Sequence, residues 1–212
     1  MIKTIKSNYL WIIFFICVLL FLALAEDVFT HEIMKGDIIG YNLVSKYLIK
    51  TNVTPIVKYI TWFGSATCLI IISLLTFILK NKKISICILS NLVIVTLLNQ
   101  LFKFIFERPR PTEYRIITET GYSFPSGHSM VSMAFYGFII YLIYKKVNNR
   151  YIKWLVISIL SLLIISIGIS RIYLGVHYTS DVLAGFLISI SYLIIYIKYT
   201  KKIIDKDSNY EK

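Results

Sequence analysis

The chain has 212 residues, of which 57% are hydrophobic and only 16% are charged. This composition excludes an ordinary soluble domain and indicates an integral membrane protein, since no polar stretch is long enough to form a soluble domain of its own. The formal net charge of +12 would be compatible with a nucleic-acid partner, but the basic residues gather at the ends of apolar runs, where they act as a topology signal.

Six apolar runs predict an all-α integral membrane protein with six transmembrane helices. The approximate spans are residues 9–25, 59–79, 84–102, 127–144, 154–170 and 182–197. The first run follows a basic N-terminus and therefore resembles a signal peptide. Its length, its weak cleavage sequence and the five runs after it favour a retained helix. We expect a single membrane-embedded domain over residues 1–212.

A short interfacial helix is predicted between the first and second spans. Apolar residues recur there at helical spacing, with lysines between them, which is typical of a helix that lies on the membrane surface. The residues of this pattern are Leu43, Val44, Tyr47 and Leu48, with Lys46 and Lys50.

The three cysteines lie inside apolar runs and are interpreted as packing residues. Cys17, Cys68 and Cys87 show no metal-binding spacing. The cysteine spacing therefore gives no indication of a metal site, and no cofactor is expected for this chain.

The distribution of lysine and arginine predicts the orientation in the membrane. Six spans put both termini on one side, and 14 of the 23 basic residues fall on that side, in the N-terminal segment, two loops and the tail, with only 3 of the 11 acidic residues. The positive-inside rule makes that side cytoplasmic. The polar segment between the third and fourth spans then faces the exterior.

Three polar clusters lie where apolar runs meet this external face. Charged side chains at such positions are costly unless they are paired or functional. The first cluster has six residues between Lys103 and Arg110-Pro111, the second is Pro125-Ser126-Gly127-His128, and the third is Ser170-Arg171, five residues, His177, three residues and Asp181.

The cations in these clusters suit a phosphate group. Lys103, Arg110 and Arg171 would converge on one face, and arginine can bind a phosphate through two parallel hydrogen bonds. Ser126 is a good N-cap for the fourth span, and Gly127 lets the backbone approach a ligand closely. Free N–H groups at such a helix start attract anions.

The histidines could supply the chemistry. His128 and His177 can give or take a proton near neutral pH. Asp181 follows His177 by four residues, which would let its carboxylate fix the imidazole tautomer and leave the other nitrogen free for attack. Taken singly, each cluster could instead be an interfacial anchor, a helix cap or a structural pair. Three such clusters on one face favour a site.

These clusters resemble the three-part signature of the type 2 phosphatidic acid phosphatase family, whose site is shared with vanadium haloperoxidases. Every motif position is met, and the six-span layout resembles the bacterial integral-membrane branch. The resemblance implies a metal-independent lipid phosphatase in which His177 forms a phosphohistidine, Asp181 orients it and His128 protonates the leaving oxygen. It also implies a phosphate cradle made of Lys103, Arg110, Ser126, Gly127 and Arg171.

Other charged residues of the polar segment are given no direct role. Arg108-Pro109 is a second Arg-Pro pair, but only Arg110-Pro111 has the six-residue spacing. The remaining charged residues are interpreted as solvated or paired within the loop: Glu107, Glu113, Arg115 and Glu119.

The expected partners are the bilayer and a phosphorylated lipid, with no nucleic acid. The lipid could be undecaprenyl diphosphate, phosphatidylglycerophosphate or phosphatidic acid, as for bacterial members that act in carrier-lipid recycling or phosphatidylglycerol synthesis. A phosphotransferase that uses the same site is one alternative. A transporter or a non-catalytic scaffold is another, but the nearly charge-free spans and the intact motifs argue against both.

Overall fold

The computed structural model describes residues 2–30, 34–78 and 81–208, and within these ranges every regular element is a helix. The elements in chain order are α1 (Ile2–Phe29), α2 (Lys35–Leu48), α3 (Thr54–Trp62), α4 (Ala66–Leu75), the 3-10 helix η1 (Thr76–Ile78), α5 (Lys82–Phe106), α6 (Gly127–Lys146), α7 (Arg150–Tyr173) and α8 (Thr179–Ser208). The all-helical prediction is confirmed.

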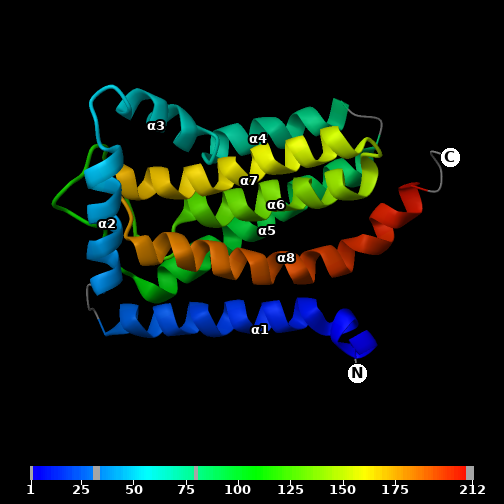
Figure 1. Ribbon diagram of the computed structural model, residues 1–212, viewed down its shortest axis with the longest axis horizontal. Helices are drawn as coiled ribbons and strands as arrows, with labels where there is room; N and C mark the ends of the chain where they lie inside the picture. Colours follow the sequence, from blue (N-terminus) through cyan, green and yellow to red (C-terminus); the bar gives the residue numbers. More distant parts are fainter. Residues whose placement is uncertain (1, 31–33, 79–80, 209–212) are drawn as a thin grey trace.

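Among the residues that the structure describes, five helices are long and apolar enough to cross a membrane. They cover Asn8–Phe29, Lys82–Phe106, Gly127–Lys146, Arg150–Tyr173 and Thr179–Asp205. A membrane core offers no water to backbone polar groups, so helices that satisfy their own hydrogen bonds are the stable way to cross it. These helices run side by side, and the start of α1 and the end of α8 lie at the same end of the bundle (Figure 1). The chain is a multi-pass membrane protein.

The second predicted span is divided in two. The sequence predicts one helix over residues 59–79, whereas α3 and the α4–η1 segment meet at a bend of 48°. Ser65 caps the new helix by accepting a hydrogen bond from the Cys68 N–H. The hydroxyl of Tyr136, from α6, donates to the Phe63 carbonyl oxygen at 2.8 Å. The break is therefore stable at membrane depth because neighbouring groups satisfy its backbone. Counted as one span, the pair brings the total to six.

Helix α6 forms the centre of the bundle, where it packs against α5, α7 and α8. Its inward residues Met130, Ala134 and Phe135 are almost completely buried. Many apolar side chains on the outer helices are exposed instead, such as Leu97 and Leu162, as expected for surfaces that face lipid. The polar start of α6 thus lies enclosed among other helices rather than in the bilayer.

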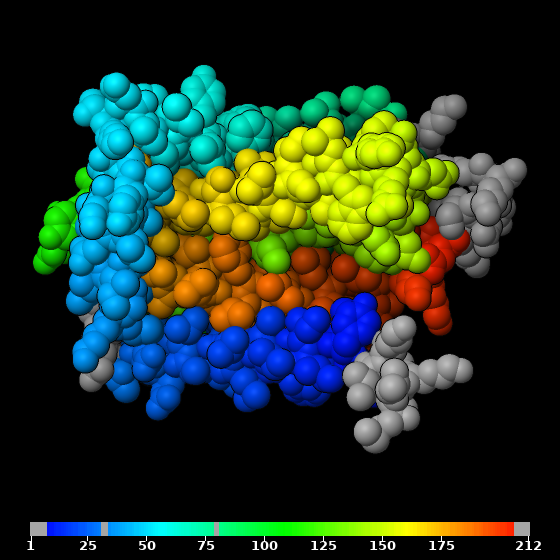
Figure 2. All heavy atoms as spheres, viewed as in Figure 1, coloured from blue at the N-terminus to red at the C-terminus, as the bar shows by residue number. Residues whose placement is uncertain are grey.

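Helix α2 lies across the end of the bundle, at right angles to the long helices (Figure 1), and covers that end from α1 to α3 (Figure 2). The predicted surface helix is therefore present, although it begins at Lys35, well before the pattern that starts at Leu43. It packs closely on the start of α8, since a Cβ atom on Gly40 would lie 2.1 Å from Thr179 Oγ1.

Candidate active site

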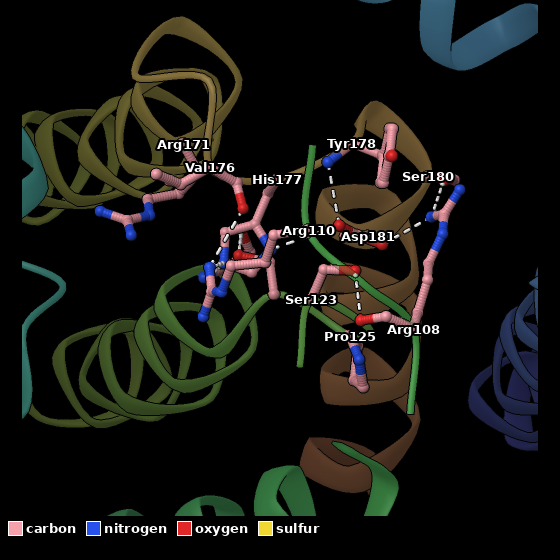
Figure 3. Close-up of polar contacts among 12 residues, drawn as sticks. Arg108, Arg110, Ser123, Pro125, Arg171, Val176, His177, Tyr178, Ser180 and Asp181 are labelled. Carbon is pink, nitrogen blue, oxygen red and sulfur yellow. Dashed lines mark hydrogen bonds and ion pairs between the residues drawn. The ribbon is translucent and has the colours of Figure 1, made fainter. Parts of the chain in front are cut away.

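The three predicted clusters meet at the end of the bundle that α2 covers. The end of α5 and the loop after it, the start of α6 and the turn between α7 and α8 all reach this point (Figure 3). The eight predicted site residues lie on these segments, on the last turn of α7 or on the first turn of α8. Residues far apart in sequence are therefore brought together by the fold.

A tight turn places His177. The turn leaves α7 at Leu174 and passes through Gly175, whose φ is +68°. A Cβ atom there would lie 2.1 Å from the Tyr114 carbonyl oxygen. Glycine is the residue that accepts this left-handed conformation without steric cost. The turn can thus press against the loop that carries Arg110.

His177 lies between Asp181 and Arg110. Its Nδ1 is 3.3 Å from Asp181 Oδ2, and its Nε2 is 3.0 Å from Arg110 Nη1. A guanidinium group has only donors, so Nε2 must be the acceptor and Nδ1–H must donate to Asp181. This tautomer leaves the lone pair of Nε2 directed toward a cation.

Burial lowers the pKa of His177 to about 4, and the opposing attraction of Asp181 does not compensate for it. The charges of Arg171 and Arg110 lower the pKa further. Only 3% of the residue surface is exposed. The imidazole is therefore neutral at pH 7, with one ring nitrogen unprotonated.

Arg110 is held by backbone carbonyls. Its Nε donates to the Gly121 oxygen at 2.9 Å, and Nη2 donates to the Thr120 oxygen at 3.0 Å. Nη1 also donates to the Val176 oxygen at 3.0 Å. Burial lowers the pKa of Arg110 from its ordinary value, but an arginine remains charged under all physiological conditions. The guanidinium is thus a fixed positive charge beside Nε2 of His177.

Arg171 is held by groups from two other segments. Its Nη2 donates to Glu119 Oε1 at 2.6 Å, and its Nη1 donates to Thr61 Oγ1 at 2.8 Å. Burial raises the pKa of Glu119, but the hydrogen bond and charge of Arg171 outweigh this and leave the pKa lowered. Glu119 is therefore paired, but its partner is Arg171 of α7, a predicted cradle residue, and not a residue of its own loop. Nε of Arg171 is buried and makes no hydrogen bond within the described part of the chain.

Lys103 and His128 lie within electrostatic reach of this cluster. Lys103, in the last turn of α5, is within electrostatic reach of Arg110, Arg171 and Asp181. His128, in the first turn of α6, is within reach of His177 and of the same cations. The second span also approaches here, since a Cβ atom on Gly64 would lie 3.2 Å from His128 Cδ2.

The start of α6 is fixed by neighbours on two sides. The Ser126 hydroxyl accepts the Ser129 N–H at 3.4 Å, as an N-cap should, and the Ser126 N–H donates to the Asp181 carbonyl oxygen at 3.0 Å. Asn99 of α5 donates to the Pro125 oxygen at 3.2 Å. A Cβ atom on Gly127 would lie 3.0 Å from Asn99 Oδ1, so a glycine is favoured there by packing as well.

Sequence reasoning gave Arg108 no role, but the structure places it against Asp181. Its Nη1 donates to Asp181 Oδ1 at 2.6 Å, and its Nη2 donates to Asp37 Oδ2 at 2.8 Å (Figure 3 shows the bond to Asp181). Arg110 is the arginine that contacts His177, consistent with the spacing argument. The sequence motifs also do not include three further residues near the site: Asp37, Thr61 and Gly64. The one sequence signal for Arg108 is the repeated Arg-Pro pair in the loop.

The site adjoins an opening to the exterior of the protein. A cavity of about 370 Å³ lies between α2, the loop after α5 and the α7–α8 turn. His177 lies in its wall, together with Tyr41, Tyr114 and Tyr178. In the described ranges, no three His, Cys, Asp or Glu side chains gather in a way that could hold a metal ion.

Comparisons with known proteins identify a family and similar enzymes. The sequence model described as "PAP2 superfamily" matches residues 84–205. Phosphatidylglycerophosphatase B of Bacillus subtilis is 29% identical over 196 residues, which are 87% of this chain and 93% of that protein. Undecaprenyl-diphosphatase of Sulfolobus acidocaldarius is 28% identical over 209 residues, 92% of this chain and 94% of that protein.

Two crystal structures have a similar fold. The PAP2-type phosphatidylglycerolphosphate phosphatase of Bacillus subtilis superposes with a TM-score of 0.79 at 28% identity and covers 88% of this chain and 95% of that one. LpxE of Aquifex aeolicus superposes with a TM-score of 0.61 at 24% identity and covers 75% of this chain and 93% of that one. The second likeness concerns the fold alone.

Proposed function

Since the chain belongs to the PAP2 superfamily and is a membrane lipid phosphatase, we propose that it hydrolyses its lipid through a phosphohistidine on His177. The observation that carries this proposal is the hydrogen-bonded chain from Asp181 through His177 to Arg110. It leaves Nε2 of a neutral imidazole unprotonated and directed at a cation. A nucleophile oriented by a third group is the arrangement that such covalent catalysis requires.

In the first step the phosphate binds among Lys103, Arg110 and Arg171. One phosphate oxygen replaces Nε2 of His177 as the acceptor for Arg110, which frees the nitrogen lone pair. The backbone N–H groups at Gly127 and the side chain of Ser126 complete the cradle. Three fixed cations stabilise the charge that spreads over the equatorial oxygens, which explains how the reaction could proceed without a metal ion.

Nε2 of His177 then forms a bond to phosphorus as the bond to the leaving oxygen breaks. His128 donates a proton to that oxygen, and Asp181 stabilises the positive imidazole. In the second step His128 takes a proton from water as the water oxygen attacks phosphorus. The N–P bond breaks, inorganic phosphate leaves, and His177 returns to its neutral form.

The proposed substrates are undecaprenyl diphosphate and phosphatidylglycerophosphate, with phosphatidic acid as a further candidate. The names of the two similar enzymes support the first two. Because the site lies where helices end, a head group could reach it while the acyl or isoprenoid chain stays in the bilayer. The excess of basic residues at the end with both termini supports an external site and cytoplasmic termini.

The test is phosphate release by purified protein from matched detergent solutions of the three lipids, with and without a chelator. We expect release that survives chelation and falls at least about 10³-fold in His177→Ala. The exposed Tyr151→Ala serves as a control, because Tyr151 lies in the first turn of α7, at the other end of that helix from Arg171. Undiminished turnover in His177→Ala would refute the nucleophile. Transfer of the phosphoryl group to an added alcohol, with little release to water, would favour the phosphotransferase alternative.

A further inference from the structure

The buried guanidinium of Arg108 joins two carboxylates from opposite ends of the sequence. Arg108 is 6% exposed, Asp37 is 3% exposed and Asp181 is fully buried. The contacts from Arg108 are 2.6 Å to Asp181 Oδ1 and 2.8 Å to Asp37 Oδ2. A buried charge is tolerated only when it is paired and hydrogen-bonded, so the three groups depend on one another.

Arg108 is fixed on every side. Its Nη1 also donates to Ser180 Oγ at 2.8 Å, and its Cζ lies 4.0 Å from the centre of the Tyr178 ring. Its carbonyl oxygen accepts the Ser123 N–H at 2.8 Å. Both terminal nitrogens are therefore occupied by Asp37, Ser180 and Asp181. Arg108 can act on a substrate only through Asp181, unlike Arg110, which contacts His177 itself.

Asp37 extends the network to α2. Its Oδ1 accepts the Ser180 N–H at 2.8 Å, and its Oδ2 accepts the Ser180 hydroxyl at 2.9 Å. Ser180 is in the first turn of α8, one residue before Asp181. The carboxylate of Asp37 thus binds the arginine that contacts the catalytic aspartate. It also binds the backbone next to that aspartate.

Resting on the function proposed above, we propose that Arg108 and Asp37 are positioning residues for the catalytic pair of His177 and Asp181. Arg108 occupies Oδ1 of Asp181, so Oδ2 remains for Nδ1–H of His177. Asp37 keeps Arg108 in place and partly neutralises its positive charge. Together they fix the direction of Nε2 and set how strongly Asp181 attracts a proton to the imidazole.

Removal of Arg108 and removal of the Asp37 charge should shift the pH dependence of activity in opposite directions. Loss of Arg108 leaves Asp181 with a stronger attraction for the imidazolium, so the acid limb of activity should move to higher pH. Without the Asp37 charge, the positive charge of Arg108 acts on Asp181 alone and weakens its attraction for the imidazolium. The acid limb should therefore move to lower pH. The other charged or titratable groups facing His177 remain the same in both cases: Arg110, Glu119, His128 and Arg171.

The decisive variant is the double substitution Asp37→Asn with Arg108→Gln. It removes one negative and one positive charge, so the buried network keeps its net charge and the protein has a better prospect of folding than Arg108→Gln alone. The matched control is Lys145→Gln with Asp205→Asn, because that ion pair spans 3.6 Å, is 39% and 45% exposed at its side chains and lies away from the site. Arg108→Lys keeps the charge but not the two-pronged geometry.

For the double variant we expect kcat to fall about 10–100-fold, as a displacement of about 1 Å would cause, with KM unchanged because the cradle is intact. The acid limb of kcat/KM should move up by about one pH unit, whereas Asp37→Asn alone should move it down. Arg108→Lys should have a kcat between those of the double variant and the wild type. The control pair should behave as the wild type.

A readout without turnover separates the two proposals. The imidazole of His177 can be titrated by NMR in 15N-histidine-labelled protein, with His177→Ala supplying the assignment among the three histidines. Its titration should move up in the double variant and down in Asp37→Asn. A wild type without phosphatase activity would overturn the proposed function. A folded double variant with wild-type kcat and an unmoved His177 titration would overturn the positioning role.

Discussion

The bend in the second span should control the position of His128, the proposed general acid, and Gly64→Ala tests this. A Cβ atom on Gly64 would lie 2.7 Å from Ile167 Cγ2 and 3.2 Å from His128 Cδ2. Carbon atoms prefer separations of about 3.5–4.0 Å, so either neighbour must move by several tenths of an ångström. Overpacking of this size costs about 1–3 kcal/mol of stability.

Gly64→Ala should also reduce the rate of catalysis. A misplacement of a catalytic group by about 1 Å can reduce a rate about 10²-fold, so we expect kcat to fall about 10-fold to 100-fold with KM little changed. His128 is proposed to protonate the leaving oxygen. The loss should therefore shrink for an aryl phosphate, whose leaving oxygen needs little protonation.

Two glycines provide controls for Gly64→Ala. A Cβ atom on Gly137 would meet Leu193 Cδ1 at 2.7 Å, away from the site, and a Cβ atom on Gly36 would have no atom of the described structure within 4 Å. Adding Ile167→Ala to Gly64→Ala removes the clash with Ile167 and leaves the contact with His128. A Gly64→Ala enzyme with the kcat of Gly137→Ala, or with the same loss for both leaving groups, would refute the role of the bend.

Two further predictions concern pH and orientation. Because burial lowers the pKa of His177 to about 4, the nucleophile should be about 90% unprotonated at pH 5, and the acid limb of kcat/KM should lie near pH 4; a limb near pH 6.5 would contradict a buried neutral imidazole. The same pKa shift makes stability depend on pH, because His177 binds a proton below pH 6.5 in the unfolded chain but only below about pH 4 in the folded protein. Thermal unfolding should therefore occur at lower temperature as the pH falls from 6.5 to 4. This decrease should be smaller in His177→Ala. A tag after Lys212 should resist protease in intact cells and become accessible in lysed cells, and ready cleavage in intact cells would reverse the proposed orientation.

The sequence predicts the site better than it predicts the supports of the site. Groups expected to touch phosphate, such as Arg110 and His177, occur at fixed local spacings because one helix end or turn must present several of them at once. Their partners come from elsewhere: Thr61 is 110 residues from Arg171, and Asp37 is 71 residues from Arg108. No periodicity along the chain specifies such pairs, because they exist only once the helices have packed.

The fold shows the same division. Apolar runs predict the long helices because spanning a membrane requires length and hydrophobicity, which are visible in the sequence. The division of the second span at Phe63 depends instead on the hydroxyl of Tyr136 and on close contact with Ile167. A glycine in an apolar run is compatible with a continuous helix as well, so the sequence alone could not locate the bend.

The position of α2 has a consequence for how the site assembles. An exposed ion pair contributes little to stability, but Asp37 and Arg108 are buried, with side chains 1% and 7% exposed. Removal of one partner from a buried pair leaves the other charge uncompensated, which is strongly destabilising. Docking of α2 and completion of the Asp181 environment are therefore linked. If α2 moved away, Arg108 would still contact Asp181 but would lose its ion pair with Asp37. A helix that carries no predicted cradle residue can in this way determine whether the proposed nucleophile is correctly oriented.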